Sequence, residues 1–249
     1  MMNNTRISFL PTQADLDIIE EWLIAEDMQK PFSGFYCNWK NSILPACREN
    51  RIVIILVDDQ PIGFQTWLNY ERTGIIQIAE IKPGFRKRGY GRILTEALLE
   101  NLKAQNIVAV KLHCQPPEAE AAWKKLGFKR YPDVEGFSGY NNFEQGRTLY
   151  RILPAYANPT KRELSGERIE LWAVDSYLSE KHPSMWKWPV KFKNGSRTLI
   201  KPIITPSLHK WNISWRTDNV TLKENQVKNF LPDKIDFDTF LIIEELPVI

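Results

Sequence analysis

The sequence IKPGFRKRGYGRILTEALLENL, residues 81–102, places the end of a strand, a basic loop and an amphipathic helix in immediate succession. The β-branched run stops at Pro83, because proline cannot donate the hydrogen bond that a central strand needs. Residues 86–92 carry four positive side chains and two glycines, and apolar residues then recur at helical spacing from Ile93 to Leu102. A strand that passes into a helix through so short a loop is typical of an α/β fold.

The loop at residues 86–92 has the composition of a phosphate-binding turn. The first N–H groups of a helix lack intrahelical partners, and the helix dipole adds partial positive charge there. Gly89 and Gly91 allow a ligand to approach the backbone closely. Full positive charges come from Arg86, Lys87, Arg88 and Arg92. A solvent-exposed basic loop is the alternative, since the sequence contains neither a GxxxxGKS/T nor a GxGxxG motif.

The first 153 residues alternate between expected strands and helices. Apolar and β-branched runs predict strands at residues 6–10, 51–57, 62–70, 74–83, 106–114 and 148–153. Helical spacing predicts helices at residues 12–27, 38–47, 89–103 and 116–127, and a Gly/Asn-rich loop follows at residues 132–146. The early strands should form an antiparallel meander, whereas the strands flanking the last two helices should pair in parallel. The sequence thus predicts an α/β domain with a mixed central sheet flanked by helices.

The chain changes character after residue 153. Residues 154–166 contain two prolines and a glycine and are predicted to be a linker. Residues 167–249 are predicted to form a small β-rich domain, with strands at 210–216 and 239–246 and a short helix at 223–230. Five of the nine tryptophans lie here, namely Trp172, Trp186, Trp188, Trp211 and Trp215. A structural or homodimer-forming role is favoured over stacking on a ligand, because most buried tryptophans belong to a core.

Composition narrows the class of partner. A formal net charge of +3 over 249 residues argues against nucleic acid as an obligate partner. Three cysteines without a CxxC pair indicate neither a disulfide framework nor a zinc site, so no metal is expected and a reducing compartment is favoured. The N-terminal residues lack a basic segment followed by an apolar run, and no apolar run approaches the ~20 residues of a membrane span. We therefore expect a cytoplasmic protein with no membrane partner.

Two motifs carry a resemblance to a known family. The spacing Arg86-x-x-Gly89-x-Gly91 resembles the acetyl-CoA-binding signature Q/R-x-x-G-x-G/A of the GNAT N-acetyltransferase superfamily. AAWKKLGF, residues 121–128, is similar to the xxLYEKLGF box of that family. The resemblance covers residues 1–153 and implies a GNAT-like mixed sheet, with acetyl-CoA as cosubstrate and no metal. It further implies acetyl transfer to a primary amine, on a small molecule or a peptide, by direct attack in a ternary complex.

The resemblance also assigns residues to the cosubstrate. It implies that the backbone N–H groups of residues 88–91 and the Arg86 side chain hold the diphosphate of CoA. The strand at residues 79–82 would open from the strand at 111–114, and the pantetheine arm would pair with its exposed edge. The N–H of Ile81 would then point at the acetyl carbonyl, where negative charge develops. The predicted cofactor-binding residues are Ile81, Arg86, Lys87, Arg88, Gly89, Tyr90, Gly91, Arg92 and Trp123.

Two residues depart from the family pattern. The tyrosine that often protonates the leaving thiolate falls at Trp123, and an indole cannot supply that proton. The asparagine that commonly opens the box is Pro116. The general acid is therefore absent, supplied by Tyr90 or Tyr140, or unnecessary because water reaches the sulfur. The alternative function is that of a non-catalytic CoA-binding or interaction protein with a GNAT-like domain.

Glu80 is the first candidate for the general base. It adjoins the carbonyl-binding position implied by the resemblance, and burial would raise its pKa toward neutrality. The alternative is a strand glutamate that faces solvent or pairs with Lys82 or Arg130. His113 is the second catalytic candidate, with a hydrogen-bonded core histidine as its alternative. Cys114 is not favoured as a nucleophile, because no activating partner is evident.

The acceptor site is expected in the early helices. In the family this region builds a variable acceptor site, while aromatic residues at such spacing equally form a core. No single residue is favoured within the group, which comprises Trp22, Glu26, Asp27, Phe32, Phe35, Tyr36 and Trp39.

Overall fold

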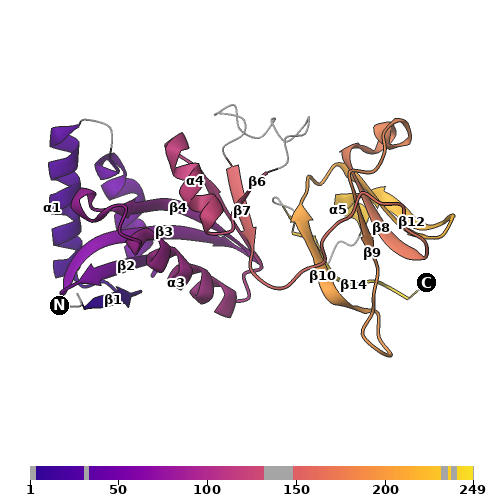
Figure 1. Cartoon of the computed structure of the whole chain (residues 1–249), viewed down its shortest axis with the longest axis horizontal. Helices are drawn as coiled ribbons and strands as arrows, with labels where there is room; N and C mark the ends of the chain where they lie inside the picture. The colour runs from indigo at the N-terminus through magenta and orange to yellow at the C-terminus, as the bar shows by residue number, and fades with distance from the viewer. Residues whose placement is uncertain (1–3, 31–33, 132–147, 231–234, 237–239, 249) are drawn as a thin grey trace. The chain divides into compact units, whose positions relative to one another are not determined.

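The computed structural model describes residues 4–30, 34–131, 148–230, 235–236 and 240–248 (Figure 1). The chain divides into two compact units, Met1–Phe128 and Lys129–Ile249. The predicted loop at residues 132–146 lies outside the described residues. The predicted domain limits at residues 153 and 166 stay a proposal.

The first unit is built on a mixed sheet. Its strands are β1 (Thr5–Ser8), β2 (Ile52–Val57), β3 (Gln60–Tyr70), β4 (Thr73–Ile81) and β5 (Ala109–His113), which are neighbours in that order. The first four pair antiparallel. The strands β4 and β5 pair in parallel, and the helix α3 (Tyr90–Ala104) connects them along the chain. The predicted antiparallel meander, the first parallel crossover and the mixed α/β fold are confirmed.

The second predicted crossover is wrong. The strand after the helix α4 (Glu120–Lys125) is β6 (Lys129–Arg130), which pairs antiparallel with β7 (Thr148–Ile152). A strand of two residues offers few hydrogen bonds, and parallel pairing is the less stable arrangement per residue.

Helices cover both faces of this sheet. The helix α1 (Gln13–Gln29) begins at a capping box, because the Thr12 hydroxyl accepts from the N–H of Asp15 and the Asp15 carboxylate accepts from the N–H of Thr12. Its buried side chains pack with Phe64 of β3 in one apolar cluster. The next residue, Gln65, points to the other face and donates to Thr95 of α3 over 2.6 Å. The helices α1 and α3 therefore lie on opposite faces of β3 (Figure 1).

The remaining helical segments of this unit are short. The predicted helix at residues 38–47 begins with the 3₁₀ turn η1 (Tyr36–Asn38). It continues as the π-helical segment η2 (Trp39–Ile43) and the helix α2 (Leu44–Arg48). The 3₁₀ turns η3 (Pro83–Phe85) and η4 (Pro117–Ala119) precede α3 and α4. Within the described ranges, no helix has the length and apolar character needed to cross a membrane.

The second unit is rich in β-structure, as predicted. One sheet has the order β12-β11-β8-β9, formed by β8 (Glu167–Asp175), β9 (Trp186–Pro189), β11 (Trp211–Thr217) and β12 (Val220–Gln226). The other has the order β10-β14-β13, formed by β10 (Thr198–Pro206), β13 (Ile235–Asp236) and β14 (Phe240–Glu245). The 3₁₀ turn η6 (Ser176–Lys181) follows β8.

The helix predicted at residues 223–230 is half wrong. Residues 223–226 continue β12, because they pair with β11 up to the partners Asn212 and Gln226. Only the single turn α5 (Val227–Phe230) is helical. Pairing with a neighbouring strand thus decides the structure of a segment whose own sequence permits a helix.

Tryptophan side chains form the core of the second unit. Trp188, Trp211 and Trp215 are at most 1% exposed and belong to one apolar cluster with Ile213, so the predicted buried face of β11 is confirmed. Two of the indole N–H groups reach acceptors, from Trp188 to the carbonyl of Ala157 and from Trp215 to Glu167. These three side chains are therefore core and offer no stacking surface.

Part of the predicted linker is bound to the second unit. The N–H of Ala157 donates to the carbonyl of Pro202 over 2.8 Å, and the N–H of Thr160 donates to Lys187 over 2.8 Å. Glu163 forms an ion pair with Lys187. Residues 157–163 thus lie along β9 and β10.

We expect Gly63→Ala to destabilise the first unit where β3 meets the end of β4. Gly63 lies opposite Ile81, and an added Cβ would overlap Ile81 Cδ1 and lie 2.8 Å from the carbonyl oxygen of Glu80. The strand backbone cannot yield cheaply, so the free energy of unfolding should fall by about 1–3 kcal/mol in urea titrations. Gly84→Ala is the control, because its Cβ would meet nothing within 4 Å. Equal stability of the two variants would contradict this account.

Candidate functional site

The turn before α3 leaves a row of backbone N–H groups open. Gly89 is the N-terminal cap residue of α3 and has a φ of 89°, a conformation that L side chains rarely adopt. Its carbonyl accepts from the N–H groups of Arg92 and Ile93, which are the first hydrogen bonds of the helix. The N–H groups of residues 87–91 have no acceptor within the described residues. This is the backbone geometry that binds an anion at a helix N-terminus.

The space in front of this turn is open as well. A Cβ added at Gly89 would meet nothing within 4 Å, and one added at Gly91 would meet only Ile81 Cγ1, at 3.7 Å. The side chains of Lys87, Arg88 and Arg92 are exposed around it. The guanidinium of Arg88 lies 5.7 Å from the ring centre of Phe85, and the ring of Phe85 lies 6.1 Å from that of Tyr90. The loop therefore fits a diphosphate by donor set, charge and room.

The pairing between the strands β4 and β5 stops before β4 ends. Their parallel register runs from Thr73 and Ala109 to Ile76 and Leu112 and stops there. A register shift at the exposed Gln77 follows, and residues 78–81 pair only with β3 within the described part of the chain. This edge of β4 leads toward Ile81 and the turn before α3, so an extended ligand could pair with it.

Glu80 is held near the end of β4 by two donors. Its side chain is 13% exposed, and its Oε1 accepts from the N–H of Ile81 over 3.0 Å and from Arg86 Nη2 over 2.8 Å. Since Glu80 lies opposite Phe64 of β3, its side chain lies on the same face of the sheet as α1.

The environment raises the pKa of the Glu80 carboxyl above its ordinary value of 4.5. Burial is the main cause, and the negative charge of Glu26 acts in the same direction. The positive charge of Arg86 and the N–H of Ile81 oppose the shift without cancelling it. A carboxylate with a raised pKa is a stronger base, as general-base catalysis requires.

Arg86 joins three elements through its guanidinium group. Its Nε donates to the carbonyl of Ile81 over 2.7 Å, and its Nη2 contacts Glu26 Oε1 at 2.6 Å in addition to Glu80 Oε1. The side chain is 42% exposed, and Nη1 has no partner in the described chain. One edge of the guanidinium therefore faces the carboxylates, while the other remains available to a ligand.

The sequence predicts Glu26 only as one member of a group in the acceptor region, with no single residue favoured. No local pattern links it with Arg86, because the two positions are 60 residues apart. Among the other members of that group, Trp22 and Trp39 are buried in the apolar cluster beneath α1, and Phe35 and Tyr36 pack against it. Phe32 lies outside the described residues.

Two buried polar atoms on α1 have no hydrogen-bond partner among the described residues, namely Glu26 Oε2 and Trp22 Nε1. Residues four apart on a helix lie on one face, and Trp22 belongs to the apolar cluster beneath α1. The Glu26 carboxylate that pairs with Arg86 is thus largely desolvated.

The other predicted residues take no part in the described contacts of Glu26, Glu80 and Arg86. His113 is exposed at the end of β5, so it is not the core histidine of the alternative interpretation. Cys114 is buried, and its Sγ lies 3.6 Å from the carbonyl of Pro116. Trp123 is half-buried on α4, with its ring 5.2 Å from that of Phe128 in an edge-to-face contact. Tyr140 lies outside the described residues.

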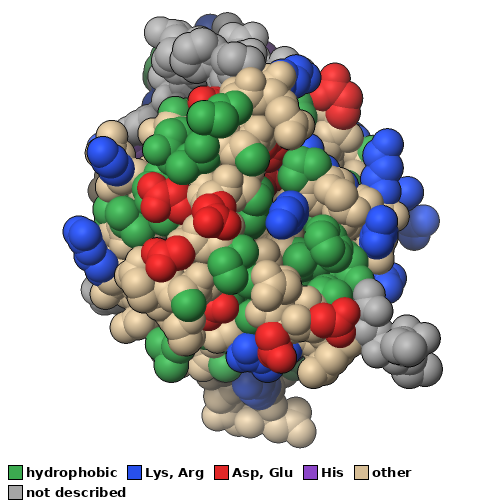
Figure 2. Space-filling view, turned by 90° about the vertical axis from the view of Figure 1, so that its left-hand side faces the viewer, with side chains coloured by type: hydrophobic (Ala, Val, Ile, Leu, Met, Phe, Trp, Pro, Cys, Tyr) green, Lys and Arg blue, Asp and Glu red, His purple; other side chains and the backbone are tan. Residues whose placement is uncertain are grey.

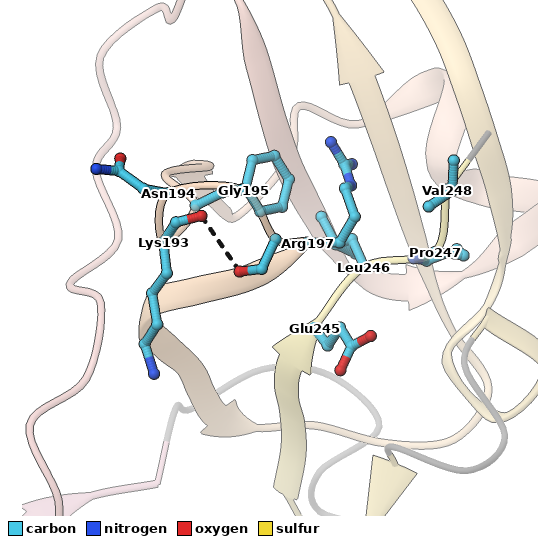
Figure 3. Close-up of a pocket in the computed structure, with 10 residues that line it drawn as sticks. Lys193, Asn194, Gly195, Arg197, Glu245, Leu246, Pro247 and Val248 are labelled. Atoms are coloured by element: carbon cyan, nitrogen blue, oxygen red, sulfur yellow. Dashed lines mark hydrogen bonds between the residues drawn. The ribbon is translucent and has the colours of Figure 1, made fainter.

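The second unit contains a pocket of its own. It has a volume of about 780 Å³ and is lined by residues 192–197 and 245–248 (Figure 3). The Arg197 guanidinium lies 3.8 Å from the ring centre of Phe192 and pairs with Glu167 at 2.7 Å. None of the predicted site residues lines this pocket.

The surface charge on one face of the molecule is mixed. Figure 2 shows acidic and basic side chains interspersed with hydrophobic ones over that face. As far as it is described, this face therefore presents charge of both signs and not one extended basic patch.

One known protein family matches the first compact unit. Residues 16–128 match the model of the Acetyltransferase (GNAT) family. The match ends at the residue where the first compact unit ends, and it contains β4, the turn before α3 and α4. No curated protein sequence matches this chain.

Solved structures with a similar fold are acetyltransferases. Ard1 from Thermoplasma volcanium is 22% identical, with a TM-score of 0.45 and coverage of 60% of this chain and 98% of that protein. The PaiA N-acetyltransferase from Thermoplasma acidophilum, in complex with coenzyme A, is 17% identical, with a TM-score of 0.46 and coverages of 60% and 99%. A GNAT acetyltransferase from Bacillus cereus is 19% identical, with a TM-score of 0.47 and coverages of 61% and 99%.

We expect the free energy of unfolding to carry a pH dependence from Glu80. The folded protein keeps the Glu80 proton above pH 4.5, where an unfolded chain has lost it. The resulting stabilisation is complete below pH 4.5 and is lost as the pH rises through the folded pKa. Urea unfolding at stepped pH should therefore show wild-type protein losing stability relative to Glu80→Gln as the pH rises. If wild-type protein instead gained stability relative to Glu80→Gln as the pH rises, the ion pair with Arg86 would outweigh burial.

Proposed function

We propose that this chain, whose residues 16–128 match the model of the Acetyltransferase (GNAT) family, transfers an acetyl group from acetyl-CoA to a primary amine. The observation that carries this proposal is the position of Glu80. A buried carboxylate with a raised pKa stands beside the open edge of β4, one turn away from the bare N–H groups at the start of α3. A base and an anion site are thus side by side on one strand-to-helix junction.

The turn before α3 would hold the diphosphate of the cosubstrate. The N–H groups of residues 88–91 would donate to its oxygens, and Lys87, Arg88 and Arg92 would add charge. The outer edge of Arg86 would face the same group. The edge of β4 between Gln77 and Ile81 would pair with the pantetheine arm.

The acetyl-CoA thioester supplies an electrophilic carbonyl, and the protein would orient it. The N–H of Ile81 would donate to the acetyl oxygen, for which Glu80 has to release the hydrogen bond that it now accepts. The same movement would turn the Glu80 carboxylate toward the acceptor. One movement of the Glu80 side chain would thus free the N–H of Ile81 and bring the carboxylate to the acceptor.

Glu80 would act as the general base. It would take one proton from the acceptor ammonium, and the freed nitrogen lone pair would form the C–N bond as the C–S bond breaks. The acylated nitrogen then releases its second proton to water, which gives the neutral amide. The departing sulfur needs a proton, which the Trp123 indole cannot give. Water or the hydroxyl of Tyr90, at the first residue of α3, would supply it. His113 remains a second candidate for the base, since it lies exposed at the end of β5.

We further propose a cytoplasmic location and a small-molecule or peptide amine as acceptor. The three cysteines are free thiols, which suits a reducing compartment. The anionic pair of Glu26 and Glu80 suits an amine that arrives as an ammonium ion. No metal is assigned a role in this chemistry.

Trp123 favours one alternative function. Without the family's usual acid, the same domain could bind CoA as a ligand and act as an interaction protein. The two functions differ in one observable, which is the release of free thiol from acetyl-CoA in the presence of an amine.

We expect Glu80→Gln to abolish most of the turnover. With acetyl-CoA and a panel of polyamines, amino acids, aminoglycosides and short peptides, wild-type protein should release thiol with at least one acceptor. The variant should lose about 10²–10⁴-fold in kcat with little change in KM for acetyl-CoA, because it retains the cosubstrate site and loses the base. Glu96→Gln, an exposed position on α3, is the control. Binding of CoA without thiol release for any acceptor would support the alternative.

We expect Gly91→Val to weaken the binding of CoA. A branched side chain at the second residue of α3 would fill the space between the helix N-terminus and Ile81, and would keep a diphosphate away from the N–H groups. Calorimetric titration with CoA should show a Kd raised by about tenfold or more. Glu96→Val, on the exposed face of the same helix, should bind as wild type does. If Gly91→Val bound CoA with unchanged affinity, this turn would not be the binding site of the diphosphate.

A further inference from the structure

We infer that Glu26 is a positioning residue for Glu80 and acts on it through Arg86. The inference depends on the proposed function, in which Glu80 is the base. It assigns a role to a side chain on α1 whose only described side-chain partner is the Arg86 guanidinium.

A single nitrogen atom connects the two carboxylates. Arg86 Nη2 lies 2.6 Å from Glu26 Oε1 and 2.8 Å from Glu80 Oε1, so the two carboxylates accept from the two N–H bonds of one nitrogen. Arg86 is itself fixed by the bond from its Nε to the carbonyl of Ile81. The guanidinium therefore cannot turn toward one carboxylate without leaving the other.

The charges around Glu80 come from few elements. Glu26 faces it from α1, Arg86 faces it from the turn after β4, and β3 presents the apolar ring of Phe64 opposite it. Two carboxylates share one guanidinium, and both are largely desolvated, with side chains 11% and 13% exposed. The group carries a net negative charge when all three residues are ionised, which keeps Glu80 basic.

A purely structural role does not account for Glu26. Its Oε2 is buried without a hydrogen-bond donor among the described residues, and an unsatisfied buried acceptor costs stability. Neighbouring Gly34 closes over the carboxylate, because a Cβ there would lie 3.6 Å from Glu26 Oε2. A charge kept in such surroundings is explained by its effect on the shared guanidinium and on the base at its other side.

Removal of the charge at Glu26 should therefore weaken the base. In Glu26→Gln, Arg86 is left to Glu80 alone, and the repulsion between the two carboxylates is gone, so the pKa of Glu80 should fall. In Arg86→Gln, Glu80 loses the positive charge that stabilises its ionised form, so the pKa of Glu80 should rise. The two variants thus change the same group in opposite directions, which a general loss of structure would not do.

The test is an NMR titration of carboxyl-labelled glutamates in the full chain, with Glu80→Gln used to assign the Glu80 signal. We expect the Glu80 midpoint to fall by about one pH unit in Glu26→Gln and to rise in Arg86→Gln. Glu26→Asp, which keeps the charge, should retain part of the wild-type midpoint. Glu21→Gln, an exposed position on α1, should leave it unchanged. A Glu80 midpoint that is the same in Glu26→Gln and in wild type overturns the inference.

Kinetics separate this inference from the proposed function. With an active acceptor, Glu26→Gln should move the acid limb of the kcat/KM profile to lower pH by the same shift and lower kcat at its plateau, with KM for acetyl-CoA unchanged. If no acceptor turns over, the proposed function fails while the titration still decides the coupling. If turnover is lost in Glu80→Gln and the profile of Glu26→Gln equals that of wild type, the function stands and the role of Glu26 fails.

Discussion

The bond from Arg86 Nε to the carbonyl of Ile81 fixes the arrangement on which the site depends. It ties the turn after β4 back onto the last residue of that strand and holds the guanidinium between α1 and β4. Because the guanidinium is fixed, Glu26 and Glu80 can both be buried at a place where two unpaired carboxylates would be strongly unfavourable.

The parallel crossover brings the other half of the site to the same place. A strand followed by a helix and a parallel partner puts the carboxyl end of the strand beside the amino end of the helix. In this chain β4 also leaves β5 after Ile76, so an unpaired strand edge leads directly to that helix end. In the proposed function, an extended acyl carrier and its phosphates would find backbone partners along one continuous path, with Glu80 near its end.

The second unit has a core of its own and contributes no predicted catalytic residue. Its buried tryptophans have aliphatic neighbours from both of its sheets, and residues 157–163 are hydrogen-bonded to it. Arg197 lines its pocket, and the guanidinium of Arg197 already packs on the ring of Phe192 and forms an ion pair with Glu167. The family match, which ends at residue 128, also leaves this unit aside.

The sequence by itself determined the features that depend on near neighbours. Thr12 and Asp15 fixed the start of α1, and the alternation of Trp211, Ile213 and Trp215 fixed the buried face of β11. The glycine at position 89 fixed the open turn before α3, since only its conformational freedom allows that backbone. The tertiary structure alone decided which residues meet across long distances in the chain. Residues 223–226 became strand because β11 offers partners, and Glu26 reached Arg86 because α1 lies on the face of the sheet toward which Glu80 points. Local propensities extend over a few residues, whereas contacts between elements follow from packing of the whole domain, which no single segment encodes.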